Sequence, residues 1–497
     1  MKRSLFYIFL LLFLIIGCKE KVTEEMLEPQ TLDPIEYSLD KNADFFLENP
    51  EINAIAIGVY KDGKTYSRYY GEMDKGQKRA PNDTTLFEIA SVTKTFTGML
   101  TAQAVLEGKL NLEADIRDYL EGSHPNLEYQ GQPIKIRDLL THTSGITRDF
   151  SPVLTKLFSL KATKEEKNAI AAYDSAKLME DLQKFSLDTL PGKRYDYSPV
   201  IAPEFLAMAL EKVYQKSYHT LLKDHILSKA AMEDATIQLS HSDSINLINS
   251  YTDNGTLVQS LPLSLSGAGY GLKATVPDLL KYIQYVLDDK NPVVKEMKKP
   301  LFLDEEEGDA YGYFWQLDGE DFMHNGGTNG STNWLIILPK YNSGFTVLFN
   351  SNGKTSGRLI NQIANRIYDD LENYPKMNPY FEVRKAVLAN TEKGIIFYQQ
   401  LKKERFSEFD FEEEGMLNRL GYELLGEKRL EDAIKIFSLL VAEFPEAFNP
   451  YDSLGEAYYM NQQYELAIKN YQKSLRLNPE NKNAEKMIEK IKEESNN

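Results

Sequence analysis

The feature that most constrains the fold is a repeat near the C-terminus. Four groups recur in register, and every offset, such as 420 to 454, is 34 residues. Leu420-Gly421, Ala433-Ile434, Phe437 and Pro445 reappear as Leu454-Gly455, Ala467-Ile468, Tyr471 and Pro479. This period, with small residues, a glycine and a closing proline, predicts two antiparallel helices in each unit.

The period resembles that of tetratricopeptide repeats, and we assign residues 414–490 to a small all-α repeat domain. Two repeats do not easily bury a stable core by themselves. We therefore expect residues 373–413, which have a helical pattern, to pack against the repeats as a linker and cap. The repeats either stabilise the chain or bind a protein partner, and the sequence leaves both readings open.

The rest of the chain must form at least one more folding unit, because 497 residues are too many for a single hydrophobic core. The net charge of −17 argues against nucleic acid as a partner, since phosphate recognition needs clustered lysine and arginine. The acidity itself is explained by solubility.

The N-terminus is interpreted as a targeting segment. Lys2 and Arg3 precede an apolar run over residues 5–16, which is shorter than the ~20 residues of a membrane-spanning helix. The run ends in Ile15-Ile16-Gly17-Cys18, which resembles a bacterial lipobox and holds the only cysteine. The resemblance implies that residues 1–18 are a lipoprotein signal, that Cys18 is acylated, and that residues 19–39 form a tether. It places the protein at the bacterial cell envelope, facing the periplasm or the exterior. A plain secretory signal is the alternative.

Between the tether and the repeats, strand patterns flank a helical region. Residues 54–60 and 65–70 are interpreted as two strands joined by a turn. Residues 110–260 are mostly helical, and strand patterns return at 313–315, 334–338 and 344–349, before a helix over 356–371. This order predicts an α/β domain of two lobes over residues 40–372, with one antiparallel sheet beside a helical lobe.

Ser91 and Lys94 carry the chemistry. They open a predicted helix over residues 91–107, and residues three apart lie on one helical face, so the hydroxyl and the amine can meet. A serine hydroxyl is a weak nucleophile until a base takes its proton, and a lysine in a dry pocket has a lowered pKa that suits this role. Two further Ser-x-x-Lys copies, at Ser38 and Ser351, are interpreted as chance.

This part of the chain resembles the serine β-lactamase and penicillin-binding-protein superfamily, most closely the class C β-lactamase-related branch. The branch includes D-alanyl-D-alanine carboxypeptidases and esterases. The resemblance rests on five motifs in order: Ser91-Val92-Thr93-Lys94; residues 139–146; Pro191-Gly192 with Tyr197-Ser198; Gly269-Tyr270-Gly271-Leu272 before Pro277; and His324-Asn325-Gly326. It implies a serine β-lactamase-like fold and a nucleophilic Ser91 assisted by Lys94.

The resemblance also implies a catalytic tyrosine. The family's Tyr-x-Asn element is matched only in part by Tyr197-Ser198-Pro199, which makes Tyr197 the general base toward the nucleophile and the acid toward the leaving group. Pro199 replaces an asparagine whose amide helps to hold the substrate, and this departure argues against efficient β-lactam turnover. Tyr195 is the alternative tyrosine.

His324-Asn325-Gly326-Gly327 stands where β-lactamases have Lys-Thr-Gly on a strand lining the pocket. The resemblance implies that His324 bonds the catalytic pair or, when protonated, attracts a substrate carboxylate. It assigns Asn325 and Gly326 to substrate binding, and the backbone N–H groups of Ser91 and Gly327 to the oxyanion hole.

Other chemistries find little support. His142 is rejected as a triad histidine, because residues 139–146 resemble an architectural loop and Lys94 and Tyr197 already supply the base. No Gly-x-Ser-x-Gly, His-Glu-x-x-His or phosphate-binding glycine motif is found, so we expect no metal and no cofactor.

The sequence thus predicts a serine hydrolase that forms an acyl-enzyme with a small peptide, amide or ester, most similar to a D-alanyl-D-alanine carboxypeptidase or esterase. One alternative is a catalytically weak sensor or scaffold that binds β-lactams or peptides and uses the repeat tail. The other is a β-lactamase.

Overall fold

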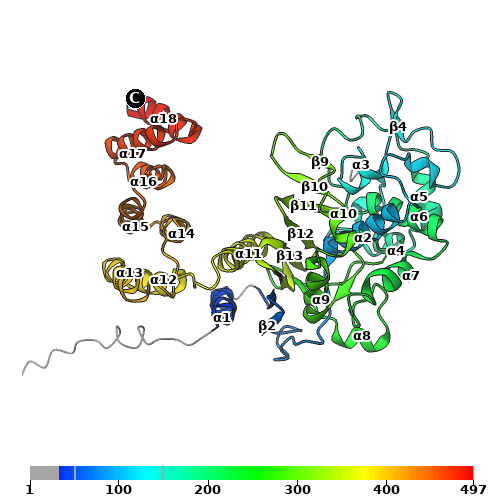
Figure 1. Cartoon of the computed structure of the whole chain (residues 1–497), viewed down its shortest axis with the longest axis horizontal. Helices are drawn as coiled ribbons and strands as arrows, with labels where there is room; N and C mark the ends of the chain where they lie inside the picture. Colours follow the sequence, from blue (N-terminus) through cyan, green and yellow to red (C-terminus); the bar gives the residue numbers. More distant parts are fainter. Residues whose placement is uncertain (1–32, 50–51, 147–149, 264, 496–497) are drawn as a thin grey trace, which may run out of the picture. The chain divides into compact units, whose positions relative to one another are not determined.

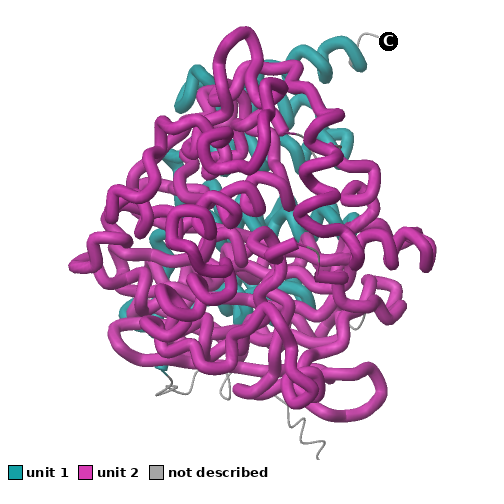
Figure 2. The backbone as a smooth tube through the Cα atoms, turned by 90° about the vertical axis from the view of Figure 1, so that its right-hand side faces the viewer, with its two compact units in different colours: residues 1–33, 379–497 teal, residues 34–378 magenta. Residues whose placement is uncertain are grey.

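The computed structural model describes residues 33–495 apart from 50–51, 147–149 and 264. The chain divides into two compact units, shown in different colours in Figure 2, with a boundary between Asn378 and Pro379. The predicted signal segment, with Cys18, lies outside the described residues. No helix in the described ranges is both long and apolar enough to cross a membrane.

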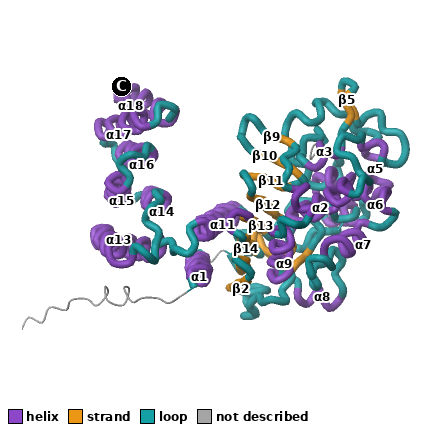
Figure 3. Tube along the Cα trace, viewed as in Figure 1, coloured by secondary structure: helices purple, strands orange, loops and turns teal. Residues whose placement is uncertain are grey.

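An eight-stranded antiparallel sheet forms the centre of the first unit, residues 34–378 (Figure 3). Its strand order is β2-β1-β14-β13-β12-β11-β10-β9. The bounds are β1 Ala54–Lys61, β2 Lys64–Gly71, β9 Phe302–Leu303, β10 Ala310–Gly312, β11 Trp315–Asp318, β12 Asp321–Gly327, β13 Thr332–Leu338 and β14 Ser343–Phe349. Because β1 pairs with β14, with Ile57 opposite Val347, the strands from both ends of the domain meet as predicted.

Helices cover both faces of this sheet (Figure 1). On one face lie α1 (Pro34–Leu47) and α11 (Lys354–Glu372), and on the other lies α9 (Val276–Leu287). Helix α1 begins within the predicted tether of residues 19–39 and continues into the predicted domain. Its buried side chains, Phe46 among them, pack on the sheet, where the Phe46 and Phe349 rings lie 5.6 Å apart. The folded unit therefore begins at Pro34.

The helical lobe holds the remaining helices of this unit and several short strands. The helices are α2 Thr93–Leu106, α3 Ile136–Leu140, α4 Lys164–Ala171, α5 Ser175–Leu182, α6 Ile201–Tyr214, α7 Tyr218–Leu222, α8 His241–Asn246 and α10 Pro292–Met297. The short strands are β3 Phe87–Glu88, β4 Glu128–Tyr129, β5 Gln132–Pro133, β6 Ser250–Thr252, β7 Leu257–Val258, β8 Lys273–Ala274 and β15 Ser351–Asn352. Helix α2 is almost wholly buried between its neighbours, which makes its first turn a rigid base for a reactive side chain.

The prediction of a strand at residues 313–315 is wrong in part. Tyr313 and Phe314 have φ angles of 50° and 68° and form the turn between β10 and β11. The turn packs against α2, where a Cβ on Gly98 would stand 2.0 Å from the Tyr313 carbonyl oxygen. Tertiary packing therefore buries both rings at a bend that an aromatic run does not predict.

The second unit is helical throughout its described part. Its helices are α12 Tyr380–Ala389, α13 Thr391–Arg405, α14 Gly415–Gly426, α15 Leu430–Glu443, α16 Asn449–Met460, α17 Tyr464–Leu477 and α18 Lys482–Ser495. Consecutive helices pack in pairs, and α12 and α13 pack on α14 and α15, the place expected for the cap. Gly421 lies against Phe437 and Gly455 lies against Tyr471, so the repeated glycine admits the repeated aromatic ring.

Candidate active site

Ser91 lies at a strained turn between β3 and α2. The preceding Ala90 has a φ of +48°, which is unfavourable for a residue with a Cβ. A single 3-10 turn, Ala90–Val92, follows and leads directly into α2. This turn packs on β12, where a Cβ on Gly326 would stand 2.4 Å from the Ile89 carbonyl oxygen. Glycine at 326 therefore allows the nucleophile turn to approach the strand closely.

Two side chains from different elements meet at the Ser91 hydroxyl. Lys94 Nζ lies 3.0 Å from Ser91 Oγ, as the three-residue spacing predicts. The Tyr197 hydroxyl, from the segment before α6, lies 2.6 Å from the same oxygen. Both candidate proton acceptors are thus within direct transfer distance of the nucleophile.

Lys94 is fully buried in the first turn of α2. Burial lowers the pKa of its amine well below the usual value for lysine, and the nearby Glu204 only partly opposes this. The amine also donates a hydrogen bond of 2.7 Å to the Gly269 carbonyl. Lys94 is thus held in one orientation and has little tendency to carry a charge, which suits a base.

The loop of residues 139–146 positions Tyr197. His142 lies beneath it, with ring centroids 4.5 Å apart, and His142 Nδ1 accepts a hydrogen bond from the Ser198 N–H at 3.2 Å. The buried His142 Nε2 has no hydrogen-bond partner among the described residues. His142 therefore supports the tyrosine and does not bond Ser91. Tyr195 stacks on Tyr311 at 4.4 Å, so Tyr197 is the tyrosine at the nucleophile.

His324 is buried on β12, beside the catalytic residues. Its Nδ1 lies 2.6 Å from the Asn325 carbonyl oxygen, so Nδ1 carries the proton and donates it. Burial and the neighbouring Lys94 lower the pKa of His324 to about 3. His324 is therefore neutral near pH 7, and the expected attraction of a carboxylate by a protonated His324 does not fit the free protein.

The other predicted residues also lie on β12, an interior strand of the sheet. Asn325 is exposed on β12, and Gly327 is half-buried at the end of the strand, opposite Thr332 of β13. Because the Ser91 turn packs on β12, the backbones of Ser91 and Gly327 lie on facing elements.

Glu204 is a residue that the sequence analysis missed. It lies buried in α6, where its carboxylate accepts hydrogen bonds from Ser266 N and Ala268 N, both at 3.0 Å. Burial raises its pKa to about 7. The loop it holds ends at Gly269, which binds Lys94. The available signal was an acidic residue among the apolar residues of the first half of α6, seven residues after Tyr197.

A small cavity of about 70 Å³ opens beside Tyr197. It is lined by Leu140, His142, Tyr195, Tyr197, Tyr311, Phe314, Gln316, Met323, His324 and Asn325. Among the described residues, no group of three or more His, Cys, Asp or Glu side chains is arranged to hold a metal ion.

Comparison with known proteins places this geometry in context. Residues 39–368 match the model of the beta-lactamase family, and residues 453–481 match that of the tetratricopeptide repeat. Protein flp of Staphylococcus aureus (strain MW2) is 26% identical over 333 residues, which cover 65% of this chain and 64% of flp. The chain thus spans slightly less than two thirds of that relative.

Two solved structures have the same fold as the first unit. A beta-lactamase/D-alanine carboxypeptidase from Yersinia pestis, complexed with citrate, has a TM-score of 0.56 and 21% identity, covering 68% of this chain and 99% of that one. A D-alanine carboxypeptidase from Burkholderia cenocepacia has a TM-score of 0.54 and 20% identity, covering 67% and 99%. The two-lobed α/β fold predicted from sequence is confirmed.

Proposed function

Because this chain belongs to the beta-lactamase family of serine hydrolases, which its residues 39–368 match, we propose that it cleaves a peptide, amide or ester through an acyl-enzyme on Ser91. One observation carries the proposal. The Ser91 hydroxyl is contacted at once by the buried Lys94 amine and the Tyr197 hydroxyl, at 3.0 and 2.6 Å.

In the first step, Ser91 Oγ attacks the substrate carbonyl as its proton leaves. The depressed pKa of Lys94 leaves a neutral amine that accepts this proton, directly or through the Tyr197 hydroxyl. The C–O bond to Ser91 forms while the carbonyl oxygen takes on negative charge. The N–H groups of Ser91 and Gly327 receive that charge, and such donors typically contribute about 3 kcal/mol each.

In the second step, Tyr197 returns the proton to the leaving group. The bond between the carbonyl carbon and the leaving nitrogen or oxygen breaks, and the acyl group stays on Ser91. Water then attacks the ester, with the same pair taking its proton, and Ser91 Oγ is released with its hydrogen. His142 holds the Ser198 N–H and thereby the adjacent Tyr197, so it acts as a positioning residue.

We propose that the substrate is a small peptide or ester, with D-alanyl-D-alanine peptides as the first class to test. Pro199 has no amide donor where the family pattern has an asparagine, which weakens the case for rapid β-lactam hydrolysis. A neutral His324 stands where β-lactamases have a lysine. Both features support a peptidase or esterase over a β-lactamase.

The cellular setting is proposed from the sequence. The lipobox-like residues 15–18 support a lipid anchor at Cys18 and a place at the bacterial cell envelope, where peptide and ester substrates are available. The repeats of the second unit support a protein partner for that unit. Mass analysis of the N-terminus, with and without globomycin treatment of the cells, tests the anchor. An unmodified Cys18 in untreated cells would contradict the lipid anchor.

The first experiment is intact-mass spectrometry of residues 19–497 with a fluorophosphonate and with a β-lactam. The native protein should gain one adduct with the fluorophosphonate, and Ser91→Ala should gain none. Ser242→Ala, which changes an exposed serine on α8, is the matched control and should label normally.

Native protein that has not been treated with either probe is then assayed on D-alanyl-D-alanine peptides, p-nitrophenyl esters and nitrocefin. Peptide or ester hydrolysis that exceeds nitrocefin hydrolysis supports the proposal. A folded native protein that no probe modifies would contradict it and favour a binding role.

A further inference from the structure

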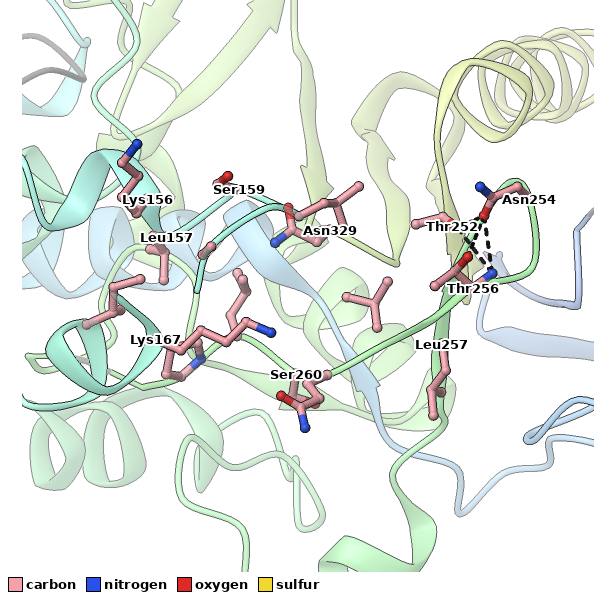
Figure 4. Close-up of a pocket in the computed structure, with 17 residues that line it drawn as sticks. Lys156, Leu157, Ser159, Lys167, Thr252, Asn254, Thr256, Leu257, Ser260 and Asn329 are labelled. Atoms are coloured by element: carbon pink, nitrogen blue, oxygen red, sulfur yellow. Dashed lines mark hydrogen bonds between the residues drawn. The ribbon is translucent and has the colours of Figure 1, made fainter. Parts of the chain in front are cut away.

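A second, larger cleft lies beside the catalytic residues. It encloses about 620 Å³ between residues 156–170 of the helical lobe, the loop of residues 252–262 and Asn329 (Figure 4). We call it the lysine-lined cleft, because Lys156 and Lys167 line it. No catalytic residue named above lines it, so its function is separate from the bond-breaking step.

Two connections link the cleft to residues around Ser91. Asn329 follows Gly327 by two residues at the end of β12, a distance of at most about 7 Å along the chain. On another side, the Tyr270 hydroxyl donates a hydrogen bond of 3.0 Å to the carbonyl of Pro262, which lines the cleft. Tyr270 directly follows Gly269, the residue that binds the catalytic lysine.

The two cavities lie at opposite ends of the catalytic segment of β12. His324 lines the small cavity beside Tyr197, whereas Asn329 lines the lysine-lined cleft beyond Gly327. Since Tyr197 protonates the leaving group in the proposed mechanism, the leaving group faces the small cavity. The lysine-lined cleft offers about 620 Å³ against about 70 Å³ in the small cavity, so a larger acyl portion finds more room on the side of the cleft.

The charge of the cleft is the opposite of the protein's net charge. Lys156 and Lys167 line it, and no aspartate or glutamate does, although the chain has a net charge of −17. Lys156 lies 3.9 Å from Glu166. Among the described residues Lys167 forms no ion pair, and in Figure 4 its amine extends from α4 into the space between the segments.

The remaining walls suit a short apolar arm that ends in a polar group. Leu157, Ile170 and Leu261 are buried apolar residues of the lining. The amides of Gln259 and Asn329 supply neutral hydrogen-bonding groups at the same cleft. A carboxylate on an aliphatic arm matches this combination, because the arm covers apolar surface while the carboxylate meets the amine.

We propose that the lysine-lined cleft receives the acyl portion of the substrate and selects an acyl group that carries a carboxylate at the end of a short apolar arm. Lys167 is the residue that sets this preference, with Lys156 at the edge. The inference rests on the proposed function, since it assigns the acyl side of the same reaction.

The test compares two p-nitrophenyl esters of equal length, the monoester of glutaric acid and the ester of pentanoic acid. The native full chain should show a higher kcat/KM for the glutaryl ester. Lys167→Gln should lower that value about tenfold, mainly through KM, and leave the pentanoyl ester within about twofold. Lys161→Gln removes an exposed lysine of the same segment that does not line the cleft, and it should change neither ester.

A second readout separates this inference from the proposed function. The anilides of the same two acids are titrated against Ser91→Ala and Ser91→Ala/Lys167→Gln by calorimetry. Tighter binding of the glutaryl anilide that depends on Lys167 supports the cleft assignment, even if the native protein hydrolyses neither ester. Ester hydrolysis that depends on Ser91 but shows no charge preference overturns the cleft assignment and leaves the hydrolase proposal intact. Equal binding of both anilides overturns it as well.

Discussion

The two units of this chain differ in how far apart in the sequence their contacting residues lie. In the hydrolase unit, residues 34–378, Tyr197 meets Ser91 across 106 positions and Lys94 meets Gly269 across 175. In the repeat unit, residues 379–497, Tyr422 bonds Glu456 across 34 positions and Ser453 bonds Asn418 across 35. The first unit therefore depends on its whole topology, whereas the second depends on neighbouring helices.

The units also differ in what they bury. The hydrolase unit encloses Lys94 and Glu204, two ionisable groups whose burial is costly. The repeat unit is organised around glycine and aromatic positions such as Gly421 with Phe437. We infer that substitutions of these buried groups in the first unit lower activity more than they lower the unfolding free energy. Substitutions in the second unit should change only the stability of that unit.

The largest effect is expected at Lys94. Lys94→Met should lower kcat/KM about 10³-fold because the base is removed. The unfolding free energy should change by less than about 2 kcal/mol, since relief of the buried amine offsets the lost bond to Gly269. Ester kinetics and urea denaturation measure the two quantities. Tyr197→Phe should behave similarly and Tyr195→Phe should lose far less activity. If Lys94→Met lowered the unfolding free energy as much as it raised the activation free energy, the distinction between the units would be contradicted.

A smaller effect concerns the pH dependence of stability. Burial raises the pKa of Glu204 from its ordinary 4.5 to about 7, so the folded state binds more protons than the unfolded state in this window. The unfolding free energy should therefore fall as pH rises from 4.5 to 7, by about 3 kcal/mol from this group. Glu204→Gln cannot titrate and should flatten the curve. Parallel curves for the two proteins would contradict the assignment of the slope to Glu204.

The repeat unit offers a matched pair of glycines. A Cβ on Gly421 would stand 2.4 Å from the Phe437 ring, whereas one on Gly455 would stand 3.1 Å from the Tyr471 ring. Gly421→Ala should destabilise the repeat unit by about 2 kcal/mol through overpacking, and Gly455→Ala should be nearly neutral because alanine favours the helix. Thermal unfolding of the two variants tests the difference. Neither should alter ester hydrolysis, and a common loss of activity would show that the units are coupled.

The smallest effect is expected from removing residues 379–497. Every residue assigned to catalysis lies in residues 34–378, which form a compact unit of their own. The shortened protein should keep kcat/KM for small esters within about twofold of the full chain. A large loss, with the shortened protein still folded by circular dichroism, would mean that the repeat unit contributes to the site.

Much of the site was predictable because its motifs are short. The three-residue spacing of Ser91 and Lys94 predicted that the hydroxyl and the amine meet, and the structure places them 3.0 Å apart, although Ser91 lies in the 3-10 turn that leads into α2. The bend at Tyr313 and the helix α1 were not predicted, because tertiary packing determined both. Glu204 was missed because its role depends on a loop 62 residues away.

The charge of His324 was also decided by tertiary structure. A histidine before a glycine pair suggested a group that protonates, but burial next to Lys94 lowers its pKa to about 3. The same holds for the choice between Tyr195 and Tyr197, which lie two positions apart. Only Tyr197 reaches Ser91, because His142 lies beneath it and holds the next backbone N–H.

The sequence by itself determined the helical repeats and the outline of the antiparallel sheet, because both follow from local periodicity. It also determined the identity of the Ser91–Lys94 pair, because that motif stands among others that resemble a known family. Only the tertiary structure decided which tyrosine completes the pair, which groups are charged, and where the lysine-lined cleft lies. The reason is physical. Helical and strand periodicities act over a few residues, whereas pKa values, hydrogen-bond partners and cavities depend on burial among residues that are distant in the chain.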